Sequence, residues 1–326
     1  MEKGELLKVE HLKKYFNTQA GLLHAVDDVS FTLNRGETLG VVGESGCGKS
    51  TLGRVILRLH EPTGGKIFFE GYDILGYSKE AMKKARRDMQ IIFQDPFASL
   101  NPRMTVSETI SEALLIQGLY STWDKEGLRK RSLELMEMVG LAPRLVNTYP
   151  HELDGGRRQR IGIARALALN PKLIICDEPV SALDVSIQAQ ILNLMQNLQD
   201  ELGFTYLFIT HDLSVVKHLS DDILVMYLGQ MVEKAPAGRL FENPLHPYTQ
   251  ALLSAIPVPD PDFNVARTIL KGELTSPIEP APGCRFAKRC PAVHEGCTGR
   301  DIEFTEREAG HFVACTLKDS GGSDSR

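Results

Sequence analysis

A glycine-rich segment at residues 43–51 reads GESGCGKST and follows a short apolar run at 39–42. Glycines at this spacing let backbone N–H groups turn toward phosphate oxygens at the positive end of the helix that follows. The Lys49 ammonium would neutralise phosphate charge, and the Ser50 hydroxyl would ligate Mg²⁺. Cys47 occupies a variable position, so we interpret it as part of the loop and not as a nucleophile. The segment predicts a nucleoside triphosphate site with these contact residues: Gly43, Glu44, Ser45, Gly46, Cys47, Gly48, Lys49, Ser50 and Thr51.

Two adjacent carboxylates, Asp177 and Glu178, follow a second apolar run at 173–176. Ligands gather at the carboxyl ends of the strands of a parallel sheet, so we expect this pair near the phosphate loop. Asp177 would hold Mg²⁺ through its water shell, and Glu178 would polarise an attacking water. A purely structural carboxylate pair is the alternative, and the earlier Lys49 segment disfavours it.

His211 and Gln94 also stand at the ends of apolar runs, at 206–210 and 91–93. We expect His211 at the same sheet edge as Glu178, where it would contact the γ-phosphate. Gln94 would reach Mg²⁺ and sense a neighbouring subunit. The candidate catalytic residues are therefore Lys49, Glu178 and His211, and the candidate Mg²⁺ ligands are Ser50, Gln94 and Asp177.

The apolar pattern predicts the elements that position these side chains. Residues 6–42 hold several short β patterns, with a hairpin turn at 34–36. Residues from about 96 to 165 are largely helical, and the segment TVSE at 105–108 is typical of a capping box. Strand and helix patterns alternate from residue 171 onward, which indicates an α/β fold with a parallel sheet.

These motifs, in this order, resemble those of the nucleotide-binding subunit of an ABC transporter over about residues 5–255. The resemblance identifies 43–51 as a Walker A motif and 173–178 as a Walker B motif. It gives Gln94 and His211 the places of the family's Q-loop and switch histidine.

The same resemblance implies stacking of Phe16, or alternatively Tyr15, on adenine, and places Asp184 in the D-loop that contacts nucleotide. It implies an α/β P-loop NTPase fold with an ABC-type, RecA-like core, an antiparallel β subdomain and a helical subdomain. The expected boundaries are 1–255 for the nucleotide-binding domain, about 96–165 for its helical subdomain and 256–326 for a small cysteine-bearing extension.

A narrower resemblance points to one importer branch. Segments 243–253 and 283–291, together with FASLNPR at 97–103, resemble the oligopeptide/dipeptide/nickel importers. Of the paired ATPases in that branch, the dipeptide F-type subunit is the more similar, because of PVSA at 179–182 and VSIQAQ at 185–190.

One segment departs from the family pattern Leu-Ser-Gly-Gly-Gln: Asp154 replaces the serine and Arg157 the glutamine, around Gly155 and Gly156. The resemblance implies that this segment opens a helix toward a nucleotide bound by a partner subunit. Aspartate is a good N-cap, so the helix should form. Because a carboxylate repels phosphate and the serine hydroxyl donor is lost, we expect a weakened second site and a heterodimer with a paralogous ATPase.

Four of the six cysteines fall near the end of the chain, at Cys284, Cys290, Cys297 and Cys315. Their spacings are wider than those of typical structural zinc sites. Four thiolates suit a [4Fe–4S] cluster, which the resemblance also implies; zinc and free thiols are the alternatives. His294 and His311 are possible further ligands, and we interpret both as surface residues.

Composition limits the class of protein. The 326 residues include 42% hydrophobic residues and carry a net charge of −5, which gives no reason to expect nucleic-acid binding. No apolar run is long enough to span a bilayer, and the N-terminus lacks the apolar core of a signal peptide. A linker rich in proline is expected at 257–282, and a frayed tail at 321–323.

The resemblance implies an ATPase at the cytoplasmic face of the inner membrane, as a peripheral subunit that energises import of di- or oligopeptides. Its implied partners are two membrane permease subunits, a paralogous ATPase and, indirectly, an extracytoplasmic substrate-binding protein. Nickel, glutathione or oligosaccharides are alternative cargoes. A non-transport ABC ATPase acting on ribosomes or DNA is a further alternative, disfavoured because the chain has one head and no coiled coil. A P-loop phosphotransferase is disfavoured by the GGRRQR segment and His211.

Overall fold

The computed structural model describes residues 4–256 and 276–317. Part of the predicted proline-rich linker and the whole of the predicted tail lie outside these described residues. Within the described ranges, no helix is both long enough and apolar enough to cross a membrane.

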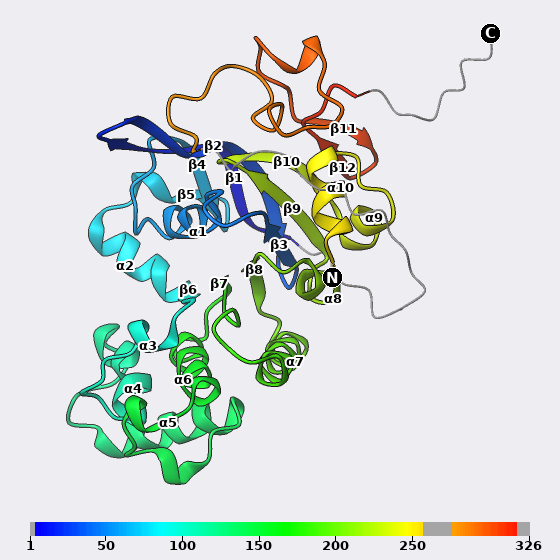
Figure 1. Cartoon of the computed structure of the whole chain (residues 1–326). Coiled ribbons are helices and arrows are strands. Elements are labelled where there is room, and N and C mark those ends of the chain that lie inside the picture. The colour runs from blue at the N-terminus through cyan, green and yellow to red at the C-terminus, as the bar shows by residue number, and fades with distance from the viewer. Residues whose placement is uncertain (1–3, 257–275, 318–326) are drawn as a thin grey trace, which may run out of the picture.

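Two β-sheets form the framework of the chain (Figure 1). The smaller sheet is antiparallel in the order β2-β1-β4-β5, formed by Glu5–Thr18 (β1), Gly21–Asn34 (β2), Gly64–Phe69 (β4) and Tyr72–Asp73 (β5). The larger sheet has the order β11-β12-β10-β9-β3-β8-β7-β6. Its strands are Thr38–Val42 (β3), Met89–Ile92 (β6), Leu173–Asp177 (β7), Thr205–Ile209 (β8), Asp222–Tyr227 (β9), Gln230–Pro236 (β10), Thr305–Glu308 (β11) and His311–Val313 (β12).

The central strands of the larger sheet are parallel, as the alternation from residue 171 predicted. Strand β3 pairs in parallel with both β8 and β9, and β7 pairs in parallel with β6 and β8. The carboxyl ends of β3, β7 and β8 therefore meet at one edge of the sheet. That edge is where the predicted phosphate loop, carboxylates and histidine follow their strands.

The expectation of several short β patterns before residue 42 was wrong, because β1 and β2 are two long strands that pair along their length. Register shifts interrupt their pairing, including one between Val9 and Leu12, and His11 and Asp28 have left-handed φ angles of 49° and 62°. Such bulges break the two-residue alternation that a sequence pattern depends on. The turn at 34–36 also differs from the prediction, since it joins β2 to β3 in the other sheet and closes no hairpin.

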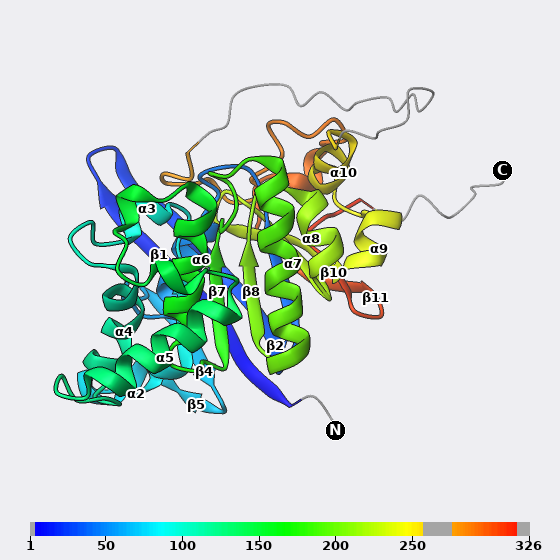
Figure 2. The ribbon, with the colours of Figure 1, turned by 90° about the horizontal axis from the view of Figure 1, so that it is seen from below.

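The helices cover both faces of the larger sheet. They are Lys49–Ile56 (α1), Lys79–Asp88 (α2), Pro96–Ser99 (α3), Val106–Ile116 (α4), Lys125–Met138 (α5), Gly155–Leu167 (α6), Val185–Leu202 (α7), Leu213–Leu219 (α8), Ala237–Glu242 (α9) and Pro247–Ser254 (α10). Figures 1 and 2 show α7 and α8 on one face and the smaller sheet on the other. Helix α1 packs on the same side as the smaller sheet, with which it shares a buried cluster. One buried apolar cluster fills each side.

Helices α3 to α6 form a separate lobe, at the lower left of Figure 1. The predicted capping box is confirmed at the start of α4: the Glu108 amide donates to Thr105 Oγ1 at 3.3 Å, and the Thr105 amide donates to Glu108 Oε2 at 2.7 Å. This lobe is the helical region expected between Gln94 and the GGRRQR segment.

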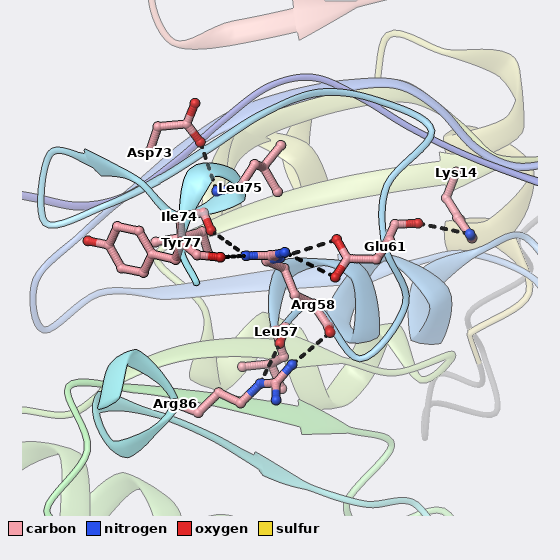
Figure 3. A network of polar contacts seen from close by, with 9 residues as sticks. All are labelled: Lys14, Leu57, Arg58, Glu61, Asp73, Ile74, Leu75, Tyr77 and Arg86. Atoms are coloured by element: carbon pink, nitrogen blue, oxygen red, sulfur yellow. Dashed lines mark hydrogen bonds and ion pairs between the residues drawn. The ribbon is translucent and has the colours of Figure 1, made fainter. Parts of the chain in front are cut away.

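Two arginines fix the chain that leaves α1, the helix that begins in the phosphate loop (Figure 3). Arg58 Nη1 donates to the carbonyls of Ile74 and Tyr77 at 2.8 and 3.1 Å. Arg86 donates to the carbonyls of Leu57 and Arg58 at 3.0 and 2.7 Å. Cationic donors stabilise carbonyls left unpaired at a helix C-terminus. The far end of α1 is thus held while its N-terminus faces the ligand site.

Candidate functional site

The phosphate loop leaves β3 at residue 43 and enters α1 at Lys49. Gly48 has a φ of 106°, and a Cβ there would lie 2.0 Å from the Ala25 carbonyl oxygen, so only glycine fits. Lys49 is buried, and its Nζ donates to the carbonyls of Gly43 and Glu44 at 2.8 and 3.0 Å. The loop therefore curls around its own lysine, with the start of α1 directed at the same space.

The loop borders a cavity of about 670 Å³. The residues that line it are Phe16, Leu23, Ala25, Gly43, Glu44, Ser45, Gly46, Gly48, Lys49, Ser50, Thr51, Gln94, Glu178, His211, Leu213, Leu252 and Pro277. Every predicted loop residue except Cys47 is among them, together with Gln94, Glu178 and His211. Residues from seven separate stretches of the sequence thus meet around one space.

Phe16 is one of the residues that line this cavity. The Lys14 ammonium lies 4.7 Å from the centre of its ring. Tyr15, the alternative in the sequence prediction, is engaged elsewhere: its ring stacks on His24 with centroids 3.9 Å apart, and its hydroxyl donates to Asp27. Of the two aromatics, Phe16 is among the residues that line the cavity and Tyr15 is not.

Cys47 is not among the residues that line the cavity. It is 1% exposed, and burial raises the pKa of its thiol. A buried neutral thiol is a poor nucleophile. This environment agrees with the interpretation of Cys47 as part of the loop.

Ser50 and Asp177 form an oxygen-rich pair beside the loop. Ser50 Oγ donates to Asp177 Oδ1 at 2.6 Å, while Asp177 Oδ2 is buried with no hydrogen-bond partner among the described residues. Its nearest cation is the Arg54 guanidinium, with Nη2 at 3.6 Å. Burial raises the pKa of Asp177. A hydroxyl and an unsatisfied carboxylate oxygen are the donor types that Mg²⁺ prefers, so the residues fit this ion.

Glu178 is the meeting point of three strand ends. Its Oε2 accepts from Gln94 Nε2 at 2.9 Å and lies 3.3 Å from His211 Nδ1. Its backbone has a φ of 49°, which is costly for a residue with a side chain and typical of functional sites. The geometry therefore brings together Gln94, Glu178 and His211, which sequence reasoning had placed after three separate strands.

Asp154, Gly155, Gly156 and Asp184 do not line this cavity. Asp154 caps α6, where its Oδ1 accepts from the Arg157 amide at 2.8 Å, and its Oδ2 lies 3.3 Å from Arg157 Nη1. Asp184 caps α7 in the same way, accepting from the Ile187 amide at 3.0 Å. Both aspartates are exposed, so these helix starts are open to another molecule.

The four C-terminal cysteines line one small cavity, together with His246, Pro247 and Phe286. All four are free thiols; Cys297 is buried and the others are half-buried. Burial raises the pKa of Cys284 to about 11 and also raises the pKa of Cys290 and Cys315. Among the described residues, no three histidine, cysteine or acidic side chains are arranged at metal-ligand distances.

The interpretation of His311 as a surface residue was wrong. His311 is fully buried in β12, and its Nε2 lies 2.7 Å from Oε1 of Glu233, which is equally buried in β10. In the sequence, the alternation of His311 with Val313, both of which are buried, is a hint of this burial that is too short to establish it. His294 is exposed, as expected, and contacts Thr316 Oγ1 at 3.0 Å.

Sequence reasoning missed several cavity residues. Leu252 of α10 and Pro277, which follows the undescribed segment, both line the nucleotide cavity. Pro277 is held there because its carbonyl accepts from the His24 amide at 2.9 Å. Leu252 lies in the segment 243–253 and Pro277 in the expected proline-rich linker, but neither pattern indicated a place beside the nucleotide, and only the fold brings these residues to the loop.

Comparison with protein families gives two matches. A family described as "ABC transporter" matches residues 26–181, and one described as "Oligopeptide/dipeptide transporter, C-terminal region" matches residues 232–297. The chain is 53% identical over 322 residues to the oligopeptide transport ATP-binding protein AppF of Bacillus subtilis (strain 168), covering 96% of this chain and 97% of that protein. It is 54% identical over 313 residues to OppF of the same organism, covering 96% of each.

Solved structures give the same fold. The ATP-binding cassette MJ0796, a dimer in a post-hydrolysis state with ADP and Pi, matches with a TM-score of 0.65 at 30% identity, covering 71% of this chain and 99% of that one. Clostridium perfringens cbiO1, part of the ABC transporter complex cbiONQ, matches with a TM-score of 0.64 at 30% identity, covering 73% and 91%. Two curated relatives match nearly the whole chain at more than 50% identity, and solved ATP-binding cassettes share its fold. The chain therefore belongs to the ABC transporter family, as an ATP-hydrolysing subunit of the oligopeptide/dipeptide transporter type.

Proposed function

We propose that this chain binds and hydrolyses ATP to energise the import of di- or oligopeptides through a membrane permease. The observation that carries the proposal is the end-to-end similarity to two oligopeptide transport ATP-binding proteins, joined to a nucleotide cavity with the residues for hydrolysis. The partners are two permease subunits and a paralogous ATPase at the cytoplasmic face of the inner membrane. A substrate-binding protein on the other side delivers the peptide indirectly.

Hydrolysis in this proposal uses the residues around the cavity. Lys49 exchanges its present carbonyl partners for phosphate oxygens, and the N–H groups of the loop bind the same phosphates. Ser50 and Asp177, with Gln94 nearby, would hold Mg²⁺, which neutralises phosphate charge when bound. Glu178 orients and polarises the attacking water, and His211 contacts the γ-phosphate. Phe16 stacks on adenine.

The exposed helix starts at Asp154 and Asp184 serve a second nucleotide, bound by the paralogous subunit. Gly155 and Gly156 let the start of α6 approach that nucleotide closely, and a Cβ on Gly156 would already lie 2.7 Å from Ile187 Cγ2. The Asp154 carboxylate repels phosphate there, although Arg157 offsets part of its charge. The pair of subunits therefore has one competent site and one weakened site.

The weakened site is testable by Asp154→Ser in a complex whose competent site is inactivated by Glu178→Gln. We expect the residual ATP hydrolysis of that complex to rise about a hundredfold, because a hydroxyl donor replaces a repelling carboxylate. Steady-state phosphate release measures the rate. The matched control is Asp124→Ser, which changes the cap of α5 in the same lobe, where Asp124 accepts from the Gly127 amide at 2.9 Å. An unchanged rate with Asp154→Ser would contradict the asymmetry.

The domain boundaries follow the same proposal: a nucleotide-binding domain at 1–255 and an extension at 256–326. The described part of the extension supports a docked arrangement, because β12 hydrogen-bonds to β10 and extends the larger sheet. We expect the extension to unfold together with the nucleotide-binding domain and not as an independent unit.

The four-cysteine cavity is proposed to hold a [4Fe–4S] cluster, with zinc as the alternative. Four free thiols around one cavity, shielded by Phe286 and Pro247, support it. Burial raises the pKa of the Cys284, Cys290 and Cys315 thiols, so these three are neutral without a metal and loading must release their protons. When bound, the cluster would cross-link the extension.

Anaerobic purification tests this cluster. We expect a brown protein with absorbance near roughly 400 nm and iron with acid-labile sulfide in stoichiometric amounts. Cys297→Ser should lower the iron content, whereas Cys176→Ser, in the buried strand β7, should not. A colourless preparation with one zinc per chain would exclude the cluster.

Co-purification tests the transport role itself. Tagged full-length chain should be recovered from the membrane fraction with two permease subunits and the paralogous ATPase. Recovery with ribosomes or DNA, and none with permeases, would favour the non-transport ATPase instead.

A further inference from the structure

A segment of the C-terminal extension touches the phosphate loop directly. Arg289 Nη1 and Nη2 donate to Glu44 Oε2 and Oε1 at 2.7 and 3.1 Å. The two side chains are 11% and 26% exposed, so the pair is largely shielded from water. Bidentate arginine–carboxylate pairs of this kind are among the stronger and more directional polar contacts.

Glu44 is held from a second side as well. Its amide donates to the hydroxyl of Tyr248 at 2.8 Å. Tyr248 is buried and packs against Phe286, three residues before Arg289, with ring centroids 5.4 Å apart. The Glu44 carbonyl in turn accepts from Lys49 Nζ at 3.0 Å. Glu44 therefore links Arg289 of the extension to the lysine of the nucleotide site.

A second arginine of the same segment, Arg285, contacts residues that pack against the phosphate loop. Arg285 donates to the Asp27 carboxylate and to the Leu228 carbonyl. The adjacent Gly229 amide donates to the Cys47 carbonyl at 2.8 Å, inside the phosphate loop. Arg285 and Arg289 thus support the loop at two places, through contacts that start in the extension.

Arg289 neutralises the negative charge of Glu44 beside the nucleotide cavity. Glu44 lines the nucleotide cavity, where an unpaired carboxylate would repel a triphosphate. A surface ion pair would contribute little, but this pair is shielded, bidentate and joined to Lys49 through one residue. Removing the arginine both frees the loop and leaves a negative charge beside the ligand.

We propose that Arg289 is a positioning residue of the nucleotide site, which holds Glu44 and neutralises its carboxylate so that the loop accepts a triphosphate. The C-terminal extension thereby sets the ATP affinity of this subunit. This inference rests on the nucleotide site of the proposed function. It adds a residue from outside the matched nucleotide-binding motifs.

The test is titration calorimetry on the purified full chain, with a non-hydrolysable MgATP analogue and with MgADP. Arg289→Met should weaken analogue binding about tenfold or more, which is the loss expected for a charge-assisted hydrogen-bond pair. The loss should be smaller for MgADP, which carries less negative charge. Arg289→Lys should recover part of the affinity, and Arg300→Met, an exposed arginine of the same extension, serves as the matched control.

The double variant Arg289→Met with Glu44→Gln distinguishes a loss of affinity caused by the unpaired Glu44 charge from one caused by a disturbed fold. If Arg289 neutralises Glu44, removing the carboxylate restores analogue binding toward the wild-type value. Wild-type affinity in Arg289→Met, or no recovery in the double variant with a normal melting temperature, would overturn the inference. If Arg289→Met fails to fold, the same comparison is made with Arg289→Lys. The affinity of Arg289→Lys for the analogue is then compared with that of the double variant Arg289→Lys with Glu44→Gln. Failure of the wild-type chain itself to bind either nucleotide would instead refute the proposed function.

Discussion

Glu178→Gln lowers ATP hydrolysis by the assembled transporter about a hundredfold or more and leaves ATP binding in place. The substitution keeps the size of the side chain and removes the base that polarises the attacking water, a contribution of about 10²–10⁴ in rate. The residual rate comes from the weakened second site. Phosphate release measures hydrolysis, and a fluorescent ATP analogue measures binding.

The matched control for this variant is Glu201→Gln, which changes an exposed carboxylate at the end of α7, a helix that contributes no residue to the lining of the cavity. It should hydrolyse ATP at the wild-type rate. A Glu178→Gln complex with more than half of the wild-type rate would show that another group activates the water. His211 and Gln94, its two neighbours, would then be the next residues to replace.

Glu233→Ala lowers the free energy of unfolding by about 3–5 kcal/mol, because several buried hydrogen-bond donors lose the same acceptor, at about 1–3 kcal/mol for each unsatisfied group. Glu233 accepts from His311 Nε2, from the Leu245 amide and from the His246 amide, at 2.7, 2.7 and 2.9 Å. All of these donors lose their acceptor together. Because β12 and the start of α10 meet at this carboxylate, the loss should loosen the extension first.

Urea unfolding followed by circular dichroism measures the effect of Glu233→Ala. Glu308→Ala is the control, since Glu308 lies in β11 and forms an exposed ion pair with Arg239 at 3.4 Å, worth at most about 1 kcal/mol. A cost for Glu233→Ala as small as that of the control would mean that water or a rearranged side chain replaces the carboxylate.

The sequence predicted the chemical groups of the site better than the framework around them. Lys49, Ser50, Asp177 and Glu178 belong to short motifs whose chemistry requires those residue types at those spacings. Each motif also follows an apolar strand, and parallel strands present their carboxyl ends at one edge. Local patterns were therefore enough to expect that Glu178 and His211 would meet.

Contacts between distant segments carried no such local signal. The pairing of Arg289 with Glu44 spans most of the chain. Glu44 occupies a variable position of the phosphate-loop motif, and the resemblance of segment 283–291 to the importer branch does not say what Arg289 contacts. Bulges hid the length of β1 and β2. The burial of His311 depended on β12 joining β10, which a short two-residue alternation could not establish by itself. Tertiary pairing decided these features.

Uptake of a labelled peptide into vesicles that contain the complete transporter tests the central claim most directly. Vesicles with the wild-type chain should accumulate peptide when ATP is supplied on the side of the ATPase subunits. Vesicles with Glu178→Gln, carrying the same amount of assembled complex, should accumulate it at about a hundredth of that rate. Undiminished ATP-dependent uptake by the Glu178→Gln complex would contradict the claim that hydrolysis at this cavity drives transport.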